Sequence, residues 1–230
     1  MPDLEVPRHL GFIVDGNRRW AKKHGLPAYE GHLAGYNALK DVIIDTINEG
    51  VEYVSLYTFS TENWKRAKEE VRNLMGLMML LFKTDLKLMI ENDLRLLVLG
   101  SYDRLPSKMI AAIESAQEQT AHCKKGTVVV CFNYGGQQEI VYAVRQLNEK
   151  GIFGEDITVE SISENLYHPE VPPVDLIVRT SKEQRLSNFM LWRSPYSELL
   201  FFDKLFPDMK KADVRKIINE YGLRSRRFGK

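Results

Sequence analysis

The sequence predicts one α/β domain with a mainly parallel sheet flanked by helices, and three observations carry this prediction. Several short apolar runs are continuous rather than alternating, which is typical of strands covered on both faces. Helix-like segments separate these runs along the whole chain, as in folds where helices connect parallel strands. The chain of 230 residues shows no repeat, low-complexity segment or linker. Since a domain averages about 150 residues, we expect residues 1–230 to form a single domain.

Six apolar runs predict the strands of the sheet, and helical periodicity predicts five longer helices. The strands cover residues 10–14, 53–59, 94–99, 127–132, 174–178 and, more weakly, 199–202, and the helices cover 35–48, 69–92, 107–121, 139–149 and 212–221. The second helix has no polar face from Leu74 to Phe82, which predicts deep burial or a wall around an elongated apolar ligand. The segment 151–173 contains three prolines and predicts an excursion from the domain.

Composition and charge exclude several classes of protein. Hydrophobic residues make up 44% of the chain and charged residues 27%, which excludes a disordered tail, a disulfide scaffold and a collagen-like chain. The net charge is only +1, so we expect no nucleic-acid partner, and any anion must be bound by a local cluster. The two cysteines predict reduced thiols in a cytoplasmic protein. No apolar stretch reaches the ~20 residues of a membrane span, and the N-terminal residues have no signal-peptide core.

Polar residues follow four of the predicted strands at their carboxyl ends, where ligands bind in folds of this class. The four segments are DGNRRW at 15–20, STENWKR at 60–66, NYGG at 133–136 and RTSKEQRLSN at 179–188. Because the carboxyl ends of parallel strands meet at one edge of a sheet, we expect these arginines, amides, hydroxyls and glycines to converge there.

The segment DGNRRW combines a tight turn at Gly16 with the start of a helix near Asn17. Exposed backbone N–H groups at a helix start favour phosphate, and Arg18 and Arg19 add two permanent charges. A carboxylate beside such a cradle, here Asp15, is the usual means of holding Mg²⁺ next to a phosphate. The alternative is a simple turn followed by a solvated basic helix.

Two further segments offer groups that bind anions. Ser60 and Asn63 provide a hydroxyl and an amide after the second strand, and Arg66 provides a cation. Arg179 and Arg185 lie six residues apart after the fifth strand and predict a second anion site. The structural alternatives are a cap on the next helix for the first segment and a surface loop with ion pairs for the second. Neither alternative excludes binding.

Eight motifs follow one another from residue 15 to residue 229, within a likeness that extends from residue 9: DGNRRWAKKHG, GHLAG, FSTENWKR, NYGG, PVDLIVRT, RLSNFMLW, SELLF and RRFG. This ordered set resembles the cis-prenyltransferases, most of all their undecaprenyl diphosphate synthase branch. The resemblance implies a six-stranded parallel sheet with a hydrophobic tunnel, in a cytoplasmic homodimer that touches a membrane at most peripherally. It also implies Mg²⁺-dependent condensation of isopentenyl diphosphate with an allylic diphosphate, usually farnesyl diphosphate. The product is a Z-polyprenyl diphosphate, and diphosphate is released.

The resemblance also assigns roles to residues of this chain by their position in the motifs. Asp15 matches a catalytic, metal-linked aspartate, Asn63 matches a residue that helps to remove the proton, and Glu198 matches a second acid near the metal. The matched substrate-binding residues are Gly16, Asn17, Arg18, Arg19, Trp20, His32 and Arg66 for the allylic diphosphate; Ser60 and Trp64 for substrate orientation; Arg179, Arg185 and Ser187 for isopentenyl diphosphate; and Arg227 and Gly229 in a C-terminal tail (about 222–230) that reaches the dimer partner.

Three departures from the family pattern leave alternatives open. Ala28 stands where an arginine is common, Ser181 and Lys182 replace a usual pair of glycines, and Gln184 replaces a frequent histidine. The first alternative is a synthase of short or branched cis-prenyl diphosphates. The second is a non-catalytic accessory subunit of a heteromeric enzyme, although such a subunit is expected to lose the first phosphate motif, which is intact here.

Overall fold

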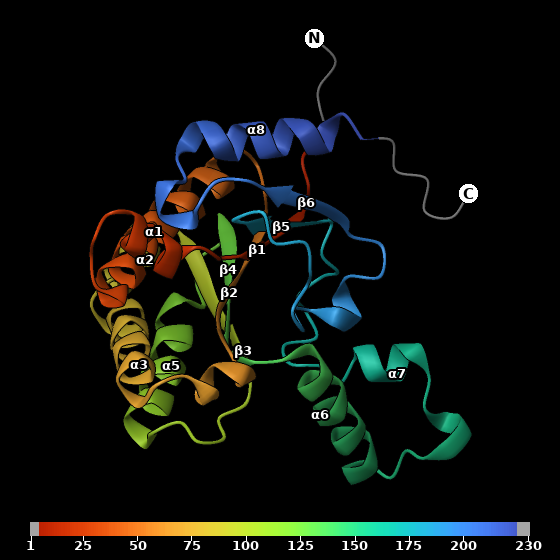
Figure 1. Cartoon of the computed structure of the whole chain (residues 1–230). Helices are drawn as coiled ribbons and strands as arrows, with labels where there is room; N and C mark the ends of the chain where they lie inside the picture. The colour runs from red at the N-terminus through yellow and green to blue at the C-terminus, as the bar shows by residue number, and fades with distance from the viewer. Residues whose placement is uncertain (1–4, 225–230) are drawn as a thin grey trace.

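One sheet of six parallel strands forms the centre of the protein, in the order β3-β4-β2-β1-β5-β6 (Figure 1). The computed structural model describes residues 5–224. The strands are β1 (His9–Ile13), β2 (Tyr53–Ser60), β3 (Leu94–Leu99), β4 (Gly126–Tyr134), β5 (Leu176–Thr180) and β6 (Glu198–Phe202). All six predicted strands are confirmed, with bounds shifted by at most two residues, and the predicted α/β class is confirmed with them.

Eight α-helices surround the sheet within the described part of the chain. They are α1 (Asn17–Lys23), α2 (Ala28–Asn48), α3 (Lys68–Lys83), α4 (Leu86–Glu91), α5 (Ser107–Thr120), α6 (Gly136–Glu149), α7 (Val159–Ser163) and α8 (Lys211–Gly222), with 3₁₀ turns η1 (Thr61–Lys65), η2 (Gly154–Asp156), η3 (Leu191–Arg193) and η4 (Phe206–Asp208). Helices α2, α3 and α5 lie on one side of the sheet, whereas α6 and α7 extend from the other (Figure 1). Between residues 5 and 224, no helix is long and apolar enough to cross a membrane.

The strands contribute alternate residues to two separate apolar clusters, which explains why their apolar runs are continuous. Val128 and Val130 of β4 belong to the larger cluster, under α2, α3, α5 and α8, whereas Val129 and Cys131 belong to a smaller cluster on the opposite face. That second face is covered mainly by the chain around Phe189 rather than by helices. Both cysteines are buried and free, as predicted.

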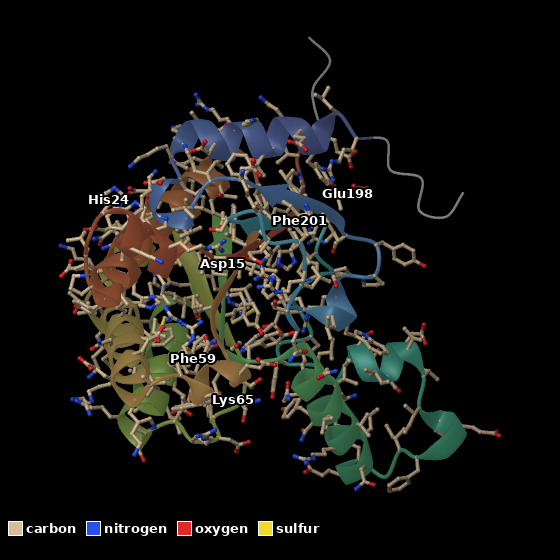
Figure 2. The ribbon with its side chains drawn as sticks, in the orientation of Figure 1. Asp15, His24, Phe59, Lys65, Glu198 and Phe201 are labelled. Carbon is tan, nitrogen blue, oxygen red and sulfur yellow. The ribbon has the colours of Figure 1, made fainter. Side chains whose placement is uncertain are left out.

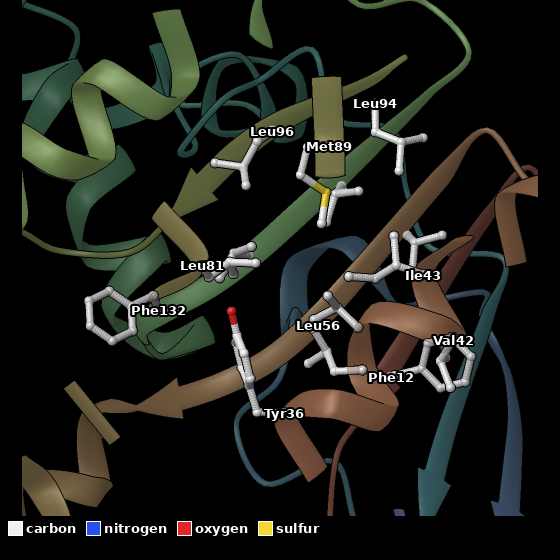
Figure 3. Packing of buried hydrophobic residues seen from close by; sticks show 14 of the residues in the cluster. Phe12, Tyr36, Val42, Ile43, Leu56, Leu81, Met89, Leu94, Leu96 and Phe132 are labelled. Atoms are coloured by element: carbon white, nitrogen blue, oxygen red, sulfur yellow. The ribbon is translucent and has the colours of Figure 1, made fainter. Parts of the chain in front are cut away.

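The predicted helix 69–92 is wrong in one respect, because it is broken into α3 and α4. Asp85 lies at the break and binds two residues of α2: the Tyr36 hydroxyl donates to its Oδ2 at 2.5 Å, and Lys40 Nζ donates to the same atom at 3.0 Å. Figure 3 shows Tyr36 beside Leu81 within the large cluster. The α3 helix also has a solvent side, since Leu80 is 41% exposed. The expected hydrophobic tunnel stays a prediction.

His9, the first residue of β1, is fully buried between two hydrogen-bond partners. Nδ1 lies 2.8 Å from the carbonyl of Pro172 and Nε2 lies 2.6 Å from Ser55 Oγ. Because a carbonyl only accepts, Nδ1 carries the proton and Nε2 accepts from the serine hydroxyl. Burial lowers the pKa of His9 from 6.5 to about 4. The folded protein therefore keeps a neutral imidazole here.

This histidine predicts an acid-sensitive stability. Below about pH 6.5 the unfolded chain takes up a proton at His9, but the folded chain does so only near pH 4, so stability falls as the pH falls through this window. We expect His9 to account for a loss of roughly 2 kcal/mol in unfolding free energy between pH 7 and pH 5. Urea unfolding of the wild type and of His9→Asn at both pH values measures this contribution. The variant should show a flatter dependence, the exposed His122→Asn control should not, and equal slopes for all three would contradict the prediction.

Candidate active site

The four strands whose ends carry the polar segments are neighbours in the sheet. The order β4-β2-β1-β5 places them side by side, and each pair is parallel. Their carboxyl ends therefore open on one edge, as predicted. We call the segments 15–20, 60–66, 133–136 and 179–188 the strand-end rim.

Asp15 lies between two arginines at the centre of the strand-end rim. Arg179 Nη2 donates to Asp15 Oδ2 at 2.9 Å, and Arg19 Nη2 lies 3.3 Å from Asp15 Oδ1. The main chain of Asp15 is fixed as well, because its carbonyl accepts from Thr180 Oγ1 at 2.7 Å and from Ser181 Oγ at 2.8 Å. Burial raises the pKa of Asp15, but the hydrogen bond and charge of Arg179, together with Arg19, outweigh burial and hold the pKa below its usual value. Asp15 is therefore a carboxylate held by two guanidinium groups.

Arg179 is a buried side chain whose hydrogen bonds connect Asp15 with the loop after β5. Its side chain is 5% exposed. Nη1 donates to Ser187 Oγ at 2.7 Å and to the Arg185 carbonyl at 2.5 Å, while Nη2 binds Asp15. Its Nε is buried and has no partner within residues 5–224. One guanidinium thus stands between the two places where anions are predicted to bind.

Glu183, a residue that the sequence did not single out, lies between Arg19 and Arg185. Arg185 Nη1 donates to Glu183 Oε2, and Arg19 Nη1 lies 3.1 Å from Glu183 Oε1. The Arg185 side chain is 59% exposed. The surface ion-pair interpretation therefore describes Arg185 but not the buried Arg179. An anion that replaced the Glu183 carboxylate would be met by both exposed guanidiniums.

Glycines allow the turn after β1 to pack tightly against its neighbours. Gly16 has a φ of +111°, and a Cβ there would lie 2.1 Å from Ser181 Oγ, so a side chain is excluded. A Cβ on Gly35 of α2 would lie 2.3 Å from Asn17 Oδ1. That Oδ1 atom is buried and has no partner in the described structure. The packing of α2 thus fixes Asn17 at the start of α1 with one acceptor left for a ligand or water.

His32 and Arg66 meet through a residue that the sequence did not single out, Glu70 of α3. His32 Nε2 lies 3.1 Å from Glu70 Oε1, and Arg66 Nη1 donates to the same oxygen at 2.9 Å. Burial lowers the pKa of His32, and the opposing effect of Glu70 does not cancel it, since Arg66 and Arg18 also lower the pKa. Nδ1 of His32 is buried and unpaired among the described residues. The spacing of Arg66 and Glu70, four residues along a helix start, was the available signal.

Ser60 ends β2, Asn63 and Trp64 follow it, and the capping interpretation is confirmed with a different helix. Asn63 Oδ1 accepts from the Ser60 N–H at 3.1 Å and closes a capping box on η1 rather than on α3. Trp64 Nε1 donates to Asn133 Oδ1 at 2.7 Å. These contacts fix all three side chains at the strand-end rim, and their part in orienting a substrate stays a prediction.

Glu198 is not brought to Asp15 within one chain. In the parallel register, β6 begins at Glu198 three residues before the level of Ile13, which corresponds to roughly 10 Å along the strands. Glu198 Oε2 instead accepts from Arg224 Nη1 at 2.9 Å, and Figure 2 shows it beside the C-terminal end of α8. A motif match carries no information on register, so the sequence alone did not reveal this separation.

Three other predicted residues lie away from the centre or outside the structure. The Trp20 indole donates to Asp208 Oδ1 at 2.7 Å and thus faces η4. Arg227 and Gly229 lie outside the described residues. Within residues 5–224, no group of three His, Cys, Asp or Glu side chains is arranged to hold a metal ion. Asp15 can therefore supply one carboxylate to a metal ion, and the other ligands would have to come from a bound molecule or from water.

Ser181 and Lys182 both adopt left-handed backbone conformations, with φ of 74° and 62°. A side chain in this region costs about 1 kcal/mol. We expect Lys182→Gly to raise the free energy of unfolding by about 0.5 kcal/mol, because it relieves strain and removes only an exposed contact with Asp203 at 3.6 Å. Thermal unfolding measures the change. Lys216→Gly, in the interior of α8, should instead destabilise by about 1 kcal/mol, and a lower Tm for Lys182→Gly would contradict the prediction.

Comparison with known proteins gives a consistent family assignment. Residues 13–229 match the family model Prenyltransf, described as "Putative undecaprenyl diphosphate synthase". The isoprenyl transferase of Thermotoga maritima is 42% identical over 228 residues and is covered over 98% of both chains. A trans,polycis-polyprenyl diphosphate synthase ((2Z,6E)-farnesyl diphosphate specific) of Thermobifida fusca is 41% identical, over 100% of this chain and 83% of that protein.

Two solved structures share the fold over nearly the whole chain. Lavandulyl diphosphate synthase from Lavandula x intermedia, in complex with dimethylallyl diphosphate, matches with a TM-score of 0.93 and 33% identity, over 98% of this chain and 99% of that one. A probable undecaprenyl diphosphate synthase from Campylobacter jejuni matches with a TM-score of 0.83 and 32% identity, with the same coverage.

Proposed function

The chain belongs to the undecaprenyl diphosphate synthase family of prenyltransferases, and from this premise we propose that its strand-end rim joins isopentenyl diphosphate to an allylic diphosphate. Each cycle extends a cis-prenyl chain by one isoprene unit and releases diphosphate. The observation that carries the proposal is the buried Arg179, which binds Asp15 on one side and Ser187 on the other. Two diphosphate groups bound at these places would lie side by side, as a condensation requires.

The allylic diphosphate is assigned to the side of the strand-end rim formed by α1 and α2. The residues proposed to bind it are Gly16, Asn17, Arg18, Arg19, His32 and Arg66. Trp20 is proposed to contribute only through its place on α1, since its indole N–H binds Asp208. Negative charge grows on this diphosphate as its C–O bond breaks, so guanidiniums aimed at it stabilise the transition state. At an effective dielectric near 20, one unit charge pair at ~4 Å contributes about 4 kcal/mol before the cost of desolvation. A few such contacts supply a large part of a catalytic effect.

Isopentenyl diphosphate is assigned to the side formed by the loop after β5. Arg179, Arg185 and Ser187 are proposed to bind its diphosphate, in place of the present contact between Arg185 and Glu183. Ser60, Asn63 and Trp64 are proposed to orient the substrate from which the proton leaves. The order β2-β1-β5 of the strands places these residues on the same edge as Asp15.

The single carboxylate of Asp15 fits the way in which Mg²⁺ is usually bound beside phosphates. This ion takes one or two carboxylates from a protein and completes its octahedral shell with phosphate oxygens and water. We propose Asp15 as its ligand in this chain, and Glu198 only if a second chain or a rearrangement brings it near. When bound, the ion neutralises part of the charge on the leaving diphosphate.

Exposed apolar residues on α6 and after it support the proposed homodimer, whereas its cytoplasmic location is proposed on the resemblance alone. Val141, Tyr142 and Val144 of α6 are exposed, as are Phe153 and Val159 in the segment that follows. Side chains of this kind, gathered on one protruding unit, are typical of an interface between subunits. Analytical ultracentrifugation gives the oligomeric state, and a monodisperse, active homodimer would also exclude the accessory-subunit alternative. Peripheral membrane contact during product release is proposed on the resemblance alone.

Purified protein tests the main proposal directly. With Mg²⁺ and farnesyl diphosphate it should incorporate labelled isopentenyl diphosphate into an extractable prenyl diphosphate. No incorporation with farnesyl diphosphate or with shorter and longer allylic starters would refute the proposal.

Tyr36 favours a short-chain product as a second candidate. It follows His32 by one turn of α2, about 6 Å along the helix axis, and its ring is buried and fixed to Asp85. A growing chain that ran from the strand-end rim along α2 would meet this ring after about one isoprene unit. Chromatography of the products decides, since a ladder that reaches long chains excludes this candidate.

A further inference from the structure

Asn188 connects three separate segments of the strand-end rim. Its carbonyl accepts from the Gly136 N–H at 2.7 Å, and its Oδ1 accepts from the Gln137 N–H at 2.9 Å. Its Nδ2 donates to Glu62 Oε1 at 3.1 Å and to Gln138 Oε1 at 3.2 Å. One asparagine thus ties the loop after β5 to η1 and to the start of α6.

The two glycines of the NYGG motif make room for this asparagine. A Cβ on Gly135 would lie 2.7 Å from Asn188 Nδ2, and a Cβ on Gly136 would lie 3.1 Å from the Asn188 carbonyl oxygen. The first distance is too short for a side chain, and a Cβ on Gly136 would also lie 2.9 Å from the Leu191 backbone N. The glycines and Asn188 therefore form one packed unit. The motif thus serves the neighbouring loop rather than binding phosphate by itself.

The unit fixes a backbone conformation that side chains adopt only when it is held from several sides. Ser187 and Asn188 are both left-handed, with φ of 50° and 66°. An asparagine tolerates this conformation, but at Ser187 it costs about 1 kcal/mol or more and persists only where the surroundings over-determine it. Here the hydrogen bonds of Asn188 hold one residue, and the Tyr57 hydroxyl holds the other by donating to the Ser187 carbonyl at 3.1 Å. The result is a Ser187 hydroxyl that faces Arg179 at 2.7 Å.

We propose that Asn188 is the positioning residue of the isopentenyl diphosphate side of the site, through its hold on Ser187. The inference rests on the proposed function, which assigns Ser187 and Arg179 to that substrate. The inference predicts different effects on the two substrates, because Arg179 keeps its bond to Asp15 when Ser187 moves away. Loss of the asparagine side chain therefore weakens binding of isopentenyl diphosphate and leaves binding of the allylic diphosphate intact.

The donors and acceptors around this residue require an asparagine. The Gln137 N–H only donates, so Oδ1 must face it and Nδ2 must face the Glu62 carboxylate. An aspartate would place a second carboxylate against Glu62. A glutamine at position 62 would again supply a donor. Asn188→Asp is therefore expected to weaken the contact between residues 188 and 62. Asn188→Asp combined with Glu62→Gln is expected to restore it.

Calorimetric titration with each substrate alone tests the proposal, because neither substrate reacts without the other. For Asn188→Ala we expect the Kd of isopentenyl diphosphate to rise about tenfold or more, since several hydrogen bonds hold the loop, while the Kd of farnesyl diphosphate changes less than twofold. Asn188→Asp should change the two Kd values in the same way as Asn188→Ala. The double variant with Glu62→Gln should recover most of the affinity for isopentenyl diphosphate. Asn165→Ala is the matched control: this asparagine also joins two segments, by accepting from Lys150 and donating to the Ser161 carbonyl, but far from the rim.

The outcomes separate this inference from the proposed function. If the wild type binds neither substrate, the proposed function fails. If the wild type binds both and Asn188→Ala weakens both equally or neither, the inference is overturned while the function stands. A thermal unfolding curve for each variant shows that it is folded, and Asn165→Ala should lose stability without any change in either Kd. An unrescued double variant would likewise overturn the positioning role.

Discussion

Arg179→Lys is expected to lower kcat/KM for condensation by two to three orders of magnitude. The guanidinium binds Asp15, Ser187 and the Arg185 carbonyl at the same time, and it is almost fully buried. A lysine keeps the charge but offers one compact ammonium, which does not reach acceptors on both sides. Arg179 also fixes Asp15, the proposed Mg²⁺ ligand beside the leaving diphosphate. Loss of one preorganised group at a developing negative charge costs about 10²–10³ in rate. Steady-state kinetics with each substrate varied in turn measures the loss.

Arg185→Lys is the matched control, in the same loop and with the same chemical change. Its side chain is mostly exposed and pairs with Glu183, so solvent screens its contribution. We expect a loss of about tenfold or less. Equal effects of the two substitutions would show that buried geometry is not what distinguishes Arg179, and the two-sided assignment would have to be given up.

Asp15→Asn is expected to lower kcat by about 10³ and to leave the fold intact. The amide keeps the shape of the side chain but loses the charge that Arg179 and Arg19 now balance and that Mg²⁺ requires. The backbone contacts of this residue with Thr180 and Ser181 do not involve the carboxylate, so the fold should be kept. The free energy of unfolding should fall, because the buried Arg179 loses its charged partner.

Kinetics over a range of Mg²⁺ concentrations, together with thermal unfolding, measure both parts of this prediction. The wild type should show activation by Mg²⁺, and the variant should show little. Asp213→Asn is the control, because its carboxylate pairs with Lys204 at 2.7 Å and lies outside the strand-end rim. Retention of most activity in Asp15→Asn would remove the proposed metal role.

Much of the fold could be predicted from the sequence because each strand is a continuous apolar run that is covered on both faces. Within β4, Val128, Val130 and Phe132 pack into one cluster, whereas Val129 and Cys131 pack into the other, so the run 128–132 is apolar throughout. The segments that follow β1, β2, β4 and β5 could be placed at one edge for the same reason. Parallel strands bring their carboxyl ends together whatever their order in the sheet.

The remaining features depend on contacts between distant residues, which no local pattern reveals. The helix break at Asp85 is fixed by Tyr36 and Lys40, some forty-five to forty-nine residues earlier in the chain. The place of Glu198 follows from the register of β6, not from the acid itself. The bond between Asp15 and Arg179 joins residues 164 positions apart.

The position of Arg179 has a consequence for how the two substrates load. A ligand that draws this guanidinium toward Asp15 leaves less of it for Ser187, and a ligand near Ser187 has the converse effect. The two binding equilibria are then linked, and linkage is reciprocal: whatever factor the first substrate applies to the affinity of the second, the second applies to the first. In the proposed binding mode, one side chain therefore couples the two halves of the reaction.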